Sequence, residues 1–172
     1  MKKAIIVDLD NCLFDSRPID KYFPKDTSNR KQWDKYHKHY NKCKINEWCV
    51  DLIKRFIFTE EKGIYHYTVL FVTGREARKQ CINDTLDMIN MAFSIPSSRE
   101  QCIDDAFTDP GYNFRLFMRP NDCFKPDHEV KRDIYTSCIK DRFDVLFAID
   151  DRKENIDMWL SFGIPSLQCY QV

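Results

Sequence analysis

The feature that most constrains the fold of this chain is the regular alternation of short apolar runs with longer stretches of helical periodicity. The runs are rich in Val, Ile, Leu and Phe and are bounded by turn-forming residues, which is typical of buried strands. Strands that are apolar throughout and alternate with helices favour an α/β fold of three layers, in which helices cover both faces of a parallel sheet. The expected strands are 3–9, 67–73, 113–119, 144–150 and 166–171, and the expected helices are 75–93, 126–140 and 152–162.

One long interval breaks this alternation, because neighbouring strands normally need a much shorter connection. We expect a Rossmann-like core domain formed by residues 1–16 and 63–172, and a small, mostly helical cap formed by residues 17–62. Between Arg17 and Lys44 the sequence holds nine Lys or Arg residues against three Asp residues, with aromatic residues interleaved. Two interpretations fit this segment. It is either a solvated helical face with aromatic rings packed beneath it, or a cap whose basic and aromatic side chains contact phosphates and a base.

Composition narrows the class of protein. The 172 residues suffice for one domain, and 27 basic against 27 acidic side chains give no general attraction to nucleic acid or anionic membranes. No stretch resembles a signal peptide or approaches the roughly 20 apolar residues that span a bilayer, so we expect a cytoplasmic protein without membrane contact. The eight cysteines stand singly, which favours reduced thiols over disulfides or a zinc site.

Chemically reactive side chains follow the first four expected strands. In an open parallel sheet the carboxyl ends of the strands gather at one edge, where ligands bind. Carboxylates that converge there repel one another unless a cation lies between them, and a hard divalent ion such as Mg²⁺ fits that position. The four groups are Asp8 with Asp10, Thr73-Gly74-Arg75, Met118-Arg119-Pro120, and Asp150-Asp151-Arg152.

These groups suit phosphoryl transfer. Asp8 and Asp10 stand one residue apart, so one carboxylate can attack an electrophile while the other moves a proton. Thr73 and the backbone amide of Gly74 can hold the oxygens of a phosphoryl group, and a lysine can neutralise its developing charge.

Two lysines compete for that last role. Lys131 lies within an expected helix, with Asp127 one turn earlier to orient it. Lys125 precedes the proline that starts this helix and is therefore expected on a loop, so we favour Lys131. For Arg119, two interpretations stand side by side: contact with a substrate phosphate, or an ion pair with Asp122.

Four segments together resemble a known superfamily. The sequences "VDLDNCL", "FVTGR", "PDHEVK" and "AIDDRKENIDMW" are similar, in order and spacing, to the four motifs of the haloacid dehalogenase superfamily of phosphotransferases. The resemblance is closest to the 3′-phosphatase domain of polynucleotide kinase-phosphatases of the bacteriophage type, and it extends over nearly the whole chain.

The resemblance implies a role for each matching residue. Asp8 would be the nucleophile that becomes a transient aspartyl-phosphate, and Asp10 the acid that protonates the leaving alcohol and later activates water. The residues implied to hold phosphate are Thr73, Lys131, Arg17 and Arg75. The residues implied to hold Mg²⁺ are Asp8, the backbone carbonyl of Asp10, Asp150 and Asp151.

The sequence also departs from the family pattern. Asn11-Cys12 replaces the usual Gly-Thr, and because Asn tolerates a left-handed backbone, we expect Asn11 to substitute for the glycine. The stretch 94–112 is longer than is usual in the family. No GxxxxGK[ST] motif occurs, so we expect a stand-alone phosphatase without a kinase half.

Three functions follow from these observations. The first is an Mg²⁺-dependent phosphomonoesterase that removes 3′-phosphates from polynucleotide ends. The second is a phosphatase of free nucleoside monophosphates, and the third an inactive module that binds phosphorylated nucleic acid or a protein. The presence of both Asp8 and Asp10 argues against the inactive module. The expected partners are phosphorylated nucleic-acid ends or nucleotides, with no obligate protein partner, and the sequence does not distinguish DNA from RNA.

Overall fold

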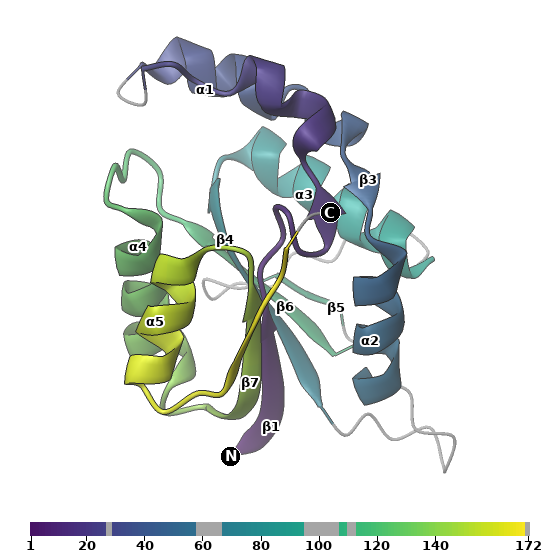
Figure 1. Cartoon of the computed structure of the whole chain (residues 1–172), viewed down its shortest axis with the longest axis vertical. Helices are drawn as coiled ribbons and strands as arrows, with labels where there is room; N and C mark the ends of the chain where they lie inside the picture. The colour runs from purple at the N-terminus through teal and green to yellow at the C-terminus, as the bar shows by residue number, and fades with distance from the viewer. Residues whose placement is uncertain (27–28, 58–66, 95–106, 110–112, 171–172) are drawn as a thin grey trace.

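The computed structural model describes residues 1–26, 29–57, 67–94, 107–109 and 113–170, which form a central sheet with helices on both faces (Figure 1). The sheet has the strand order β5-β6-β4-β1-β7-β8. Its strands are β1 (Lys2–Val7), β4 (Thr68–Glu76), β5 (Phe107–Asp109), β6 (Phe114–Arg119), β7 (Phe143–Asp150) and β8 (Ser166–Gln168). All neighbours are parallel except β5, which runs antiparallel to β6. The predicted α/β class is therefore confirmed.

The alternating side chains of β1 separate two hydrophobic cores. Ile5 and Val7 pack into one core with residues of α2 and α3, whereas Ala4 and Ile6 pack into the other with residues of α4 and α5. This division follows from the two-residue period of a strand that is buried on both faces. The helices are α2 (Glu47–Ile57), α3 (Lys79–Phe93), α4 (Asp127–Ile134) and α5 (Lys153–Ser161), and a π-helical turn, η3 (Tyr135–Ile139), continues α4.

Some boundaries differ from the sequence-based expectation. The helix expected from residue 75 begins at Lys79, because β4 continues through a register shift and pairs Glu76 with Arg119 of β6. The strand expected over 166–171 ends at Gln168. The short strand β5 was not expected, and it lies in the stretch that is long for the family.

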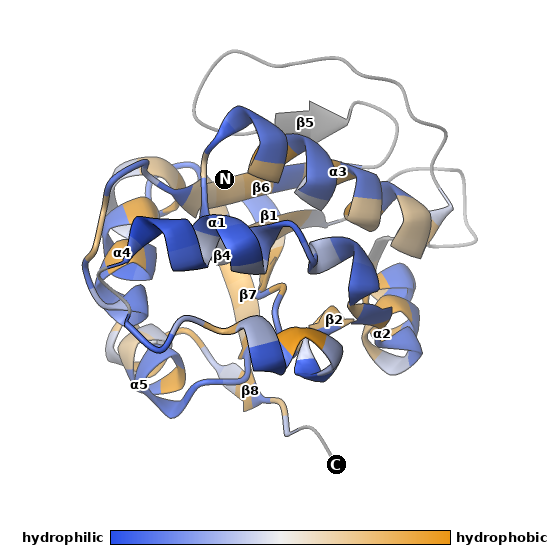
Figure 2. Ribbon diagram, turned by 90° about the horizontal axis from the view of Figure 1, so that it is seen from above, coloured by the Kyte–Doolittle hydropathy of each residue, from blue (hydrophilic) through white to orange (hydrophobic). Residues whose placement is uncertain are grey.

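The segment between β1 and β4 contains two different parts. A short strand pair, β2 (Phe14–Asp15) and β3 (Lys44–Ile45), encloses the 3₁₀ helices η1 (Arg17–Tyr22) and η2 (Tyr40–Lys42) and the helix α1 (Arg30–His37). Figures 1 and 2 show α1 lying over the carboxyl ends of β1 and β4. By contrast, α2 buries its apolar side chains in the same core as β1 and covers the sheet. The division at residues 17–62 stays a prediction.

Two further findings concern the described residues. No helix among them is both long enough and apolar enough to cross a membrane. The seven cysteines in the described part of the chain are free thiols.

Candidate active site

The carboxyl ends of β1 and β7 bring the predicted acidic residues together. Asp8 directly follows β1, and its backbone N–H donates to the carbonyl of Ile149 at 2.9 Å. Asp150 is the last residue of β7. Since β1 and β7 are parallel neighbours, residues more than 140 positions apart in sequence meet at this edge.

Lys131 lies at the centre of this group. Its Nζ donates to Asp8 Oδ1 at 2.7 Å and to Asp150 Oδ2 at 2.8 Å, and it lies 3.4 Å from Asp127 Oδ2. The lysine side chain is only 1% exposed, so these contacts form in a largely dry environment. Lys125, the competing lysine, instead forms an exposed ion pair with Asp133.

The charges in this group do not balance. Burial raises the pKa of the Asp8 carboxyl well above its ordinary value; Lys131 opposes this shift, whereas Asp150 and Asp151 add to it. Burial also raises the pKa of Asp151, and the neighbouring Asp150 raises it further. The single ammonium group of Lys131 therefore faces more carboxylates than it can neutralise. The excess negative charge favours binding of an additional cation.

Donor atoms for such a cation are present. Among the described residues, one group of three His, Cys, Asp or Glu side chains has potential metal-ligand atoms that all lie within 4.8 Å of one another. This group consists of Asp8, Cys12 and Asp151. Two carboxylates suit a hard divalent ion, whereas a thiol is a softer donor. Asp150 lies beside this group and accepts hydrogen bonds from Lys131 and Asn155.

Asp10 and Arg75 form a second charged pair in the site. Arg75 Nε and Nη2 donate to the two Asp10 oxygens at 2.9 and 2.7 Å, a bidentate ion pair. The guanidinium also donates to Thr85 Oγ1 and stacks on the ring of Tyr40, with Cζ 3.9 Å from the ring centroid. The Arg75 side chain is fully buried, so its position is fixed on several sides.

The loop after Asp8 adopts the conformation expected from its sequence. Asn11 has a φ of 62°, in the left-handed region that usually requires glycine. Its side chain accepts from Ser16 Oγ at 2.6 Å and donates to Asp151 at 3.2 Å. The prediction that Asn11 replaces the family's glycine is confirmed. Cys12 is buried with its Sγ 3.4 Å from that of Cys169.

Asn155 is a site residue that the sequence analysis missed. Its Nδ2 donates to Asp127 Oδ2 at 2.9 Å and to Asp150 Oδ1 at 2.8 Å, and the residue is 1% exposed. It therefore fixes two carboxylates around Lys131. The sequence feature that could have identified Asn155 is its place as a polar residue in the first turn of α5, next to the buried Ile156.

Gly74 and Thr73 occupy the end of β4. A Cβ at Gly74 would overlap the Asp127 carboxylate, so a larger residue here would push that carboxylate away from Lys131 and Asn155. The Thr73 side chain is fully buried and its Oγ1 accepts from the backbone N–H of Arg75 at 3.2 Å. Gly74 lines the cavity above Asp8, whereas Thr73 does not, and the proposed phosphate contacts of both residues stay predictions.

Arg119 connects three parts of the site. Its Nε donates to the Gly74 carbonyl at 2.9 Å, and its Nη2 lies 3.3 Å from Asp127 Oδ1. Its Nη1 donates to the carbonyls of Cys123 and Lys125. The carboxylate beside Arg119 is therefore Asp127; the alternative partner considered from the sequence, Asp122, pairs with Arg30.

Arg17 lies apart from these residues. Its guanidinium forms two hydrogen bonds of 2.9 Å with Asp15, and its side chain is 51% exposed. It does not line the cavity above Asp8. Contact between Arg17 and a substrate phosphate stays a prediction.

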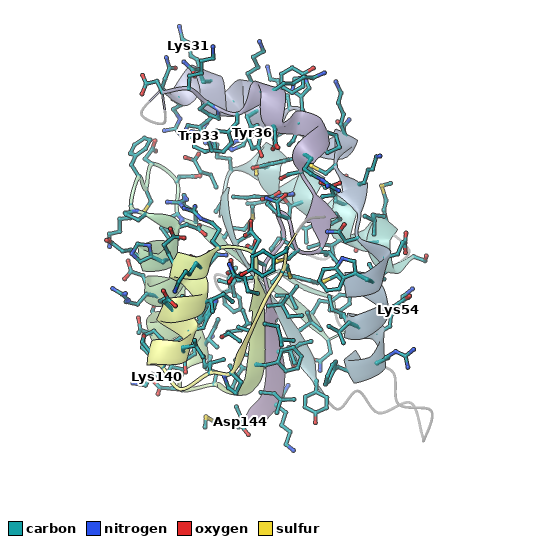
Figure 3. The ribbon with its side chains drawn as sticks, viewed as in Figure 1. Lys31, Trp33, Tyr36, Lys54, Lys140 and Asp144 are labelled. Atoms are coloured by element: carbon teal, nitrogen blue, oxygen red, sulfur yellow. The ribbon has the colours of Figure 1, made fainter. Side chains whose placement is uncertain are left out.

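A cavity of about 690 Å³ opens above the carboxylates. Asp8, Asp10 and Asp151 lie on its floor, and side chains of the segment around α1 form its roof. Figure 3 shows Trp33 and Tyr36 extending from α1 toward the sheet. The aromatic or imidazole side chains that line the cavity are Phe23, Trp33, Tyr36, His37, Tyr40 and Phe124. The structure thus identifies the aromatic residues that sequence spacing left open.

Fold, site and motif order together define a phosphatase of the haloacid dehalogenase type. The chain matches the polynucleotide kinase PNKP phosphatase domain over residues 2–172, and it belongs to this family. The family predicted from the four motifs, and its phosphatase activity, are therefore confirmed. A comparison with curated proteins found no match.

Solved structures of similar fold support the architecture. A chain in "Structure of Pnkp1/Rnl/Hen1 complex" has a TM-score of 0.64 at 20% sequence identity, covering 98% of this chain and 46% of that one. A chain in "Structure of the Pnkp1/Rnl/Hen1 RNA repair complex" has a TM-score of 0.63 at 20% identity, covering 98% and 42%. This chain therefore spans less than half the length of each of these two chains.

Proposed function

We propose that this phosphatase removes 3′-phosphates from polynucleotide ends, with Asp8 as the nucleophile and Mg²⁺ as the cofactor. The observation that carries the proposal is the position of Asp8, which is held by Lys131 on the floor of a cavity with an aromatic roof. Family membership supports polynucleotide ends as the class of substrate.

In the first half of the proposed reaction, the Asp8 oxygen that Lys131 does not hold attacks phosphorus. An Asp8–phosphate bond forms as the bond to the substrate's 3′ oxygen breaks, and Asp10 gives its proton to that oxygen. Arg75 then stabilises the resulting Asp10 carboxylate through its two hydrogen bonds. Lys131 keeps the Asp8 carboxyl oriented and offsets negative charge on the phosphoryl group.

In the second half, water attacks the phosphorus of the Asp8–phosphate. Asp10 takes a proton from this water, the Asp8–phosphate bond breaks, and inorganic phosphate leaves. Asp8 is restored as a carboxylate and Asp10 as an acid, so the cycle closes without any other reactant.

Asp8 and Asp151 are the residues that we expect to hold Mg²⁺, because their carboxylates converge and Asp151 raises the pKa of Asp8. When bound, the ion would offset phosphate charge and draw the phosphoryl group toward Asp8. Cys12 beside them is a softer donor than the family's usual residue, so its substitution by Thr tests the ion preference of the site.

Turnover by the purified protein tests the proposal. The substrates are a 3′-phosphorylated oligonucleotide, its 5′-phosphorylated counterpart and free 3′- and 5′-nucleotides, each with Mg²⁺ and with a chelator. We expect 3′-specific, Mg²⁺-dependent release of phosphate. Asp8→Asn should lower kcat on the order of 10⁴-fold or more. Asp144→Asn is the matched control, because this exposed carboxylate lies at the other end of β7 (Figure 3).

Each alternative has its own outcome. Equal turnover by Asp8→Asn would end the covalent mechanism, and hydrolysis of free nucleotides alone would favour the nucleotide phosphatase. Binding without hydrolysis of any substrate would favour the inactive module. Because the similar structures are described as complexes with Rnl and Hen1, the expectation that no protein partner is needed stays a prediction, which gel filtration of the active protein can test.

A further inference from the structure

Two thiols meet close to the carboxylates of the active site. Cys12 Sγ donates to Cys169 Sγ at 3.4 Å, although the two residues are 157 positions apart in the sequence. Cys12 is fully buried, Cys169 is 8% exposed, and both are free thiols. A disulfide bond is about 2.05 Å long, so the two sulfurs would have to approach by roughly 1.4 Å, a movement that two side chains share.

Cys12 is held in the loop that follows the proposed nucleophile. Its backbone N–H donates to the Leu9 carbonyl at 3.3 Å, and its own carbonyl accepts from Asn46 Nδ2 at 2.7 Å. Its Sγ lies within 4.8 Å of carboxylate oxygens of Asp8 and Asp151. Because buried side chains are closely packed, a movement of the Cys12 sulfur disturbs the surroundings of both carboxylates.

Cys169 is tied to the acidic pair at the end of β7. It directly follows β8, and its backbone N–H donates to the Asp150 carbonyl at 2.9 Å. The preceding residue, Gln168, donates through Nε2 to the Asp151 carbonyl at 3.0 Å. In the sheet, β7 lies between β1 and β8. A bond from Cys12 to Cys169 would therefore join the loop after β1 to the end of β8, across the end of β7.

We propose that Cys12 and Cys169 form a reversible oxidation site, at which a small disulfide such as oxidised glutathione converts the two thiols to one disulfide and lowers phosphatase turnover. The site goes beyond the proposed function, because no step of that reaction uses either sulfur. The new bond would draw the loop after Asp8 toward β8. Displacement of a reacting group by about 1 Å can lower a rate by about 100-fold.

The oxidation balances with the small disulfide as the oxidant. The Cys169 sulfur, the more exposed of the two, attacks one sulfur of the small disulfide, whose S–S bond breaks and releases one thiol. The Cys12 sulfur then attacks Cys169 Sγ, the bond between the two protein sulfurs forms, and a second thiol leaves. The protein loses two electrons and two protons, which the two released thiols carry. Because β8 is a three-residue strand at the edge of the sheet, it opens more easily than the central strands and gives access to Cys169.

A third thiol is the main competitor for Cys169. Cys49 is fully buried in α2; burial raises the pKa of its thiol, and the neighbouring Cys169 raises it further. The thiol–thiol hydrogen bond of Cys169, however, is with Cys12. We therefore expect oxidation to join Cys169 to Cys12 and to leave Cys49 reduced.

Treatment of the purified protein with oxidised glutathione tests the proposal, and peptide mapping by mass spectrometry locates the disulfide. We expect a Cys12–Cys169 disulfide and a fall in turnover of about tenfold or more, measured on a small aryl phosphate, with recovery after dithiothreitol. Cys169→Ser should keep its turnover during the same treatment. Cys138→Ser is the matched control, because this half-buried thiol packs against the other hydrophobic core. It should lose turnover as the unchanged protein does.

Several outcomes would overturn the oxidation site. They are the absence of a Cys12–Cys169 disulfide after treatment, a disulfide from Cys169 to Cys49 in its place, and equal loss of turnover in Cys169→Ser. A Cys12–Cys169 disulfide that leaves turnover unchanged would also contradict the proposal. If Cys169→Ser is inactive before treatment, the mapped disulfide and the recovery by dithiothreitol in the unchanged protein decide the question.

Failure of the proposed function gives a different pattern. If the aryl phosphate is hydrolysed and 3′-phosphorylated oligonucleotides are not, the 3′-phosphatase is ruled out. The oxidation site is then still tested, because neither the mapped disulfide nor turnover of the aryl phosphate depends on a polynucleotide substrate.

Discussion

The floor and the roof of the cavity are built in opposite ways. Beneath the floor, Lys131 and Asp150 are each 1% exposed, and the charges are held by hydrogen bonds of 2.7 to 2.8 Å. At the roof, Phe23 is more than half exposed and its ring meets neighbouring rings edge-on, and Phe124 on the cavity wall is exposed to a similar extent. The floor is thus held by buried charges, whereas the roof and the wall present aromatic rings that stay partly in water.

The floor and the roof should also differ in how much they contribute to folding stability. A charge removed from a buried group leaves its partners unpaired in a medium of low dielectric constant, which costs several kcal/mol. Aromatic contacts on an open wall contribute less to folding, because their rings stay partly in water. Changes to the floor should therefore affect both folding and chemistry, and changes to the roof should affect mainly substrate affinity.

The largest effect is expected for Lys131→Met. The substitution leaves Asp8 and Asp150 buried without a counter-charge, so we expect a loss of about 3–5 kcal/mol in the free energy of unfolding and loss of turnover. Urea denaturation measures the stability. Lys125→Met is the control, since its ion pair is exposed and its removal should leave the unfolding midpoint unchanged. Equal midpoints for the two variants would contradict the difference between buried and exposed pairs.

The next largest effect is expected in the pH dependence of folding stability, through His37 in the predicted cap. Burial, together with the neighbouring Arg75, lowers the pKa of His37 from 6.5 to about 4. Between these values the unfolded chain binds a proton that the folded chain does not, so stability falls as the pH falls from 6.5 to 4. The full contribution is at most on the order of 3 kcal/mol.

The variant His37→Gln should remove this contribution. Urea unfolding at pH 7 and pH 4.5 would then show a smaller loss of stability on acidification than in the unchanged protein. Other carboxylates titrate in the same range, so only the difference between the two proteins reports on His37. An identical pH dependence in both would show that His37 is protonated equally in the folded and unfolded chains.

A smaller effect on stability is expected at Asn11, where two substitutions distinguish backbone strain from the loss of side-chain hydrogen bonds. Both Asn11→Gly and Asn11→Ala lose the hydrogen bonds to Ser16 and Asp151, but only alanine is strained at a φ of 62°. We expect the alanine variant to be less stable than the glycine variant by about 1 kcal/mol. Thermal or urea denaturation of the two proteins measures this difference. Equal stability would show that the loop relaxes to another conformation.

The smallest effect is expected for Arg17→Ala. In the structure this side chain pairs with Asp15 outside the cavity. We expect KM for a 3′-phosphorylated oligonucleotide to rise by less than about threefold. A rise of about tenfold or more would show that Arg17 leaves Asp15 and joins the substrate, as the family resemblance implies.

Much of the floor could be predicted from the sequence, because its main features depend on residues that are close together in the chain. The strand period of residues 3–9 and the paired aspartates after it indicate an edge where ligands bind, and Lys131 is four positions after Asp127 on one helix. The left-handed backbone at Asn11 also follows from residue type alone. Such features need no knowledge of which distant segments meet.

The rest depends on contacts between distant segments. Asn155 lies 28 positions from Asp127. For Arg119 the sequence indicated a substrate phosphate or Asp122, and its pairing with Asp127 depends on the path of the loop between them. For the roof, the sequence predicted only that basic and aromatic residues are present. A run of aromatic residues does not show which ring is exposed to the cavity and which packs into the core. Both Phe23 and Tyr36 line the cavity, but Phe23 is 51% exposed whereas Tyr36 is 6% exposed and packs into the core.

The central position of β1 has a consequence for how the protein is made. Asp8 is synthesised well before its partners, because it contacts Lys131, 123 positions later, and Asn11 contacts Asp151, 140 positions later. Until β7 has been synthesised and has paired with β1, the early aspartates have neither their lysine nor their second acidic pair in place. A nascent or truncated chain that ends before β7 would therefore carry the proposed nucleophile but no assembled catalytic centre, so activity should begin only after β7 has been made.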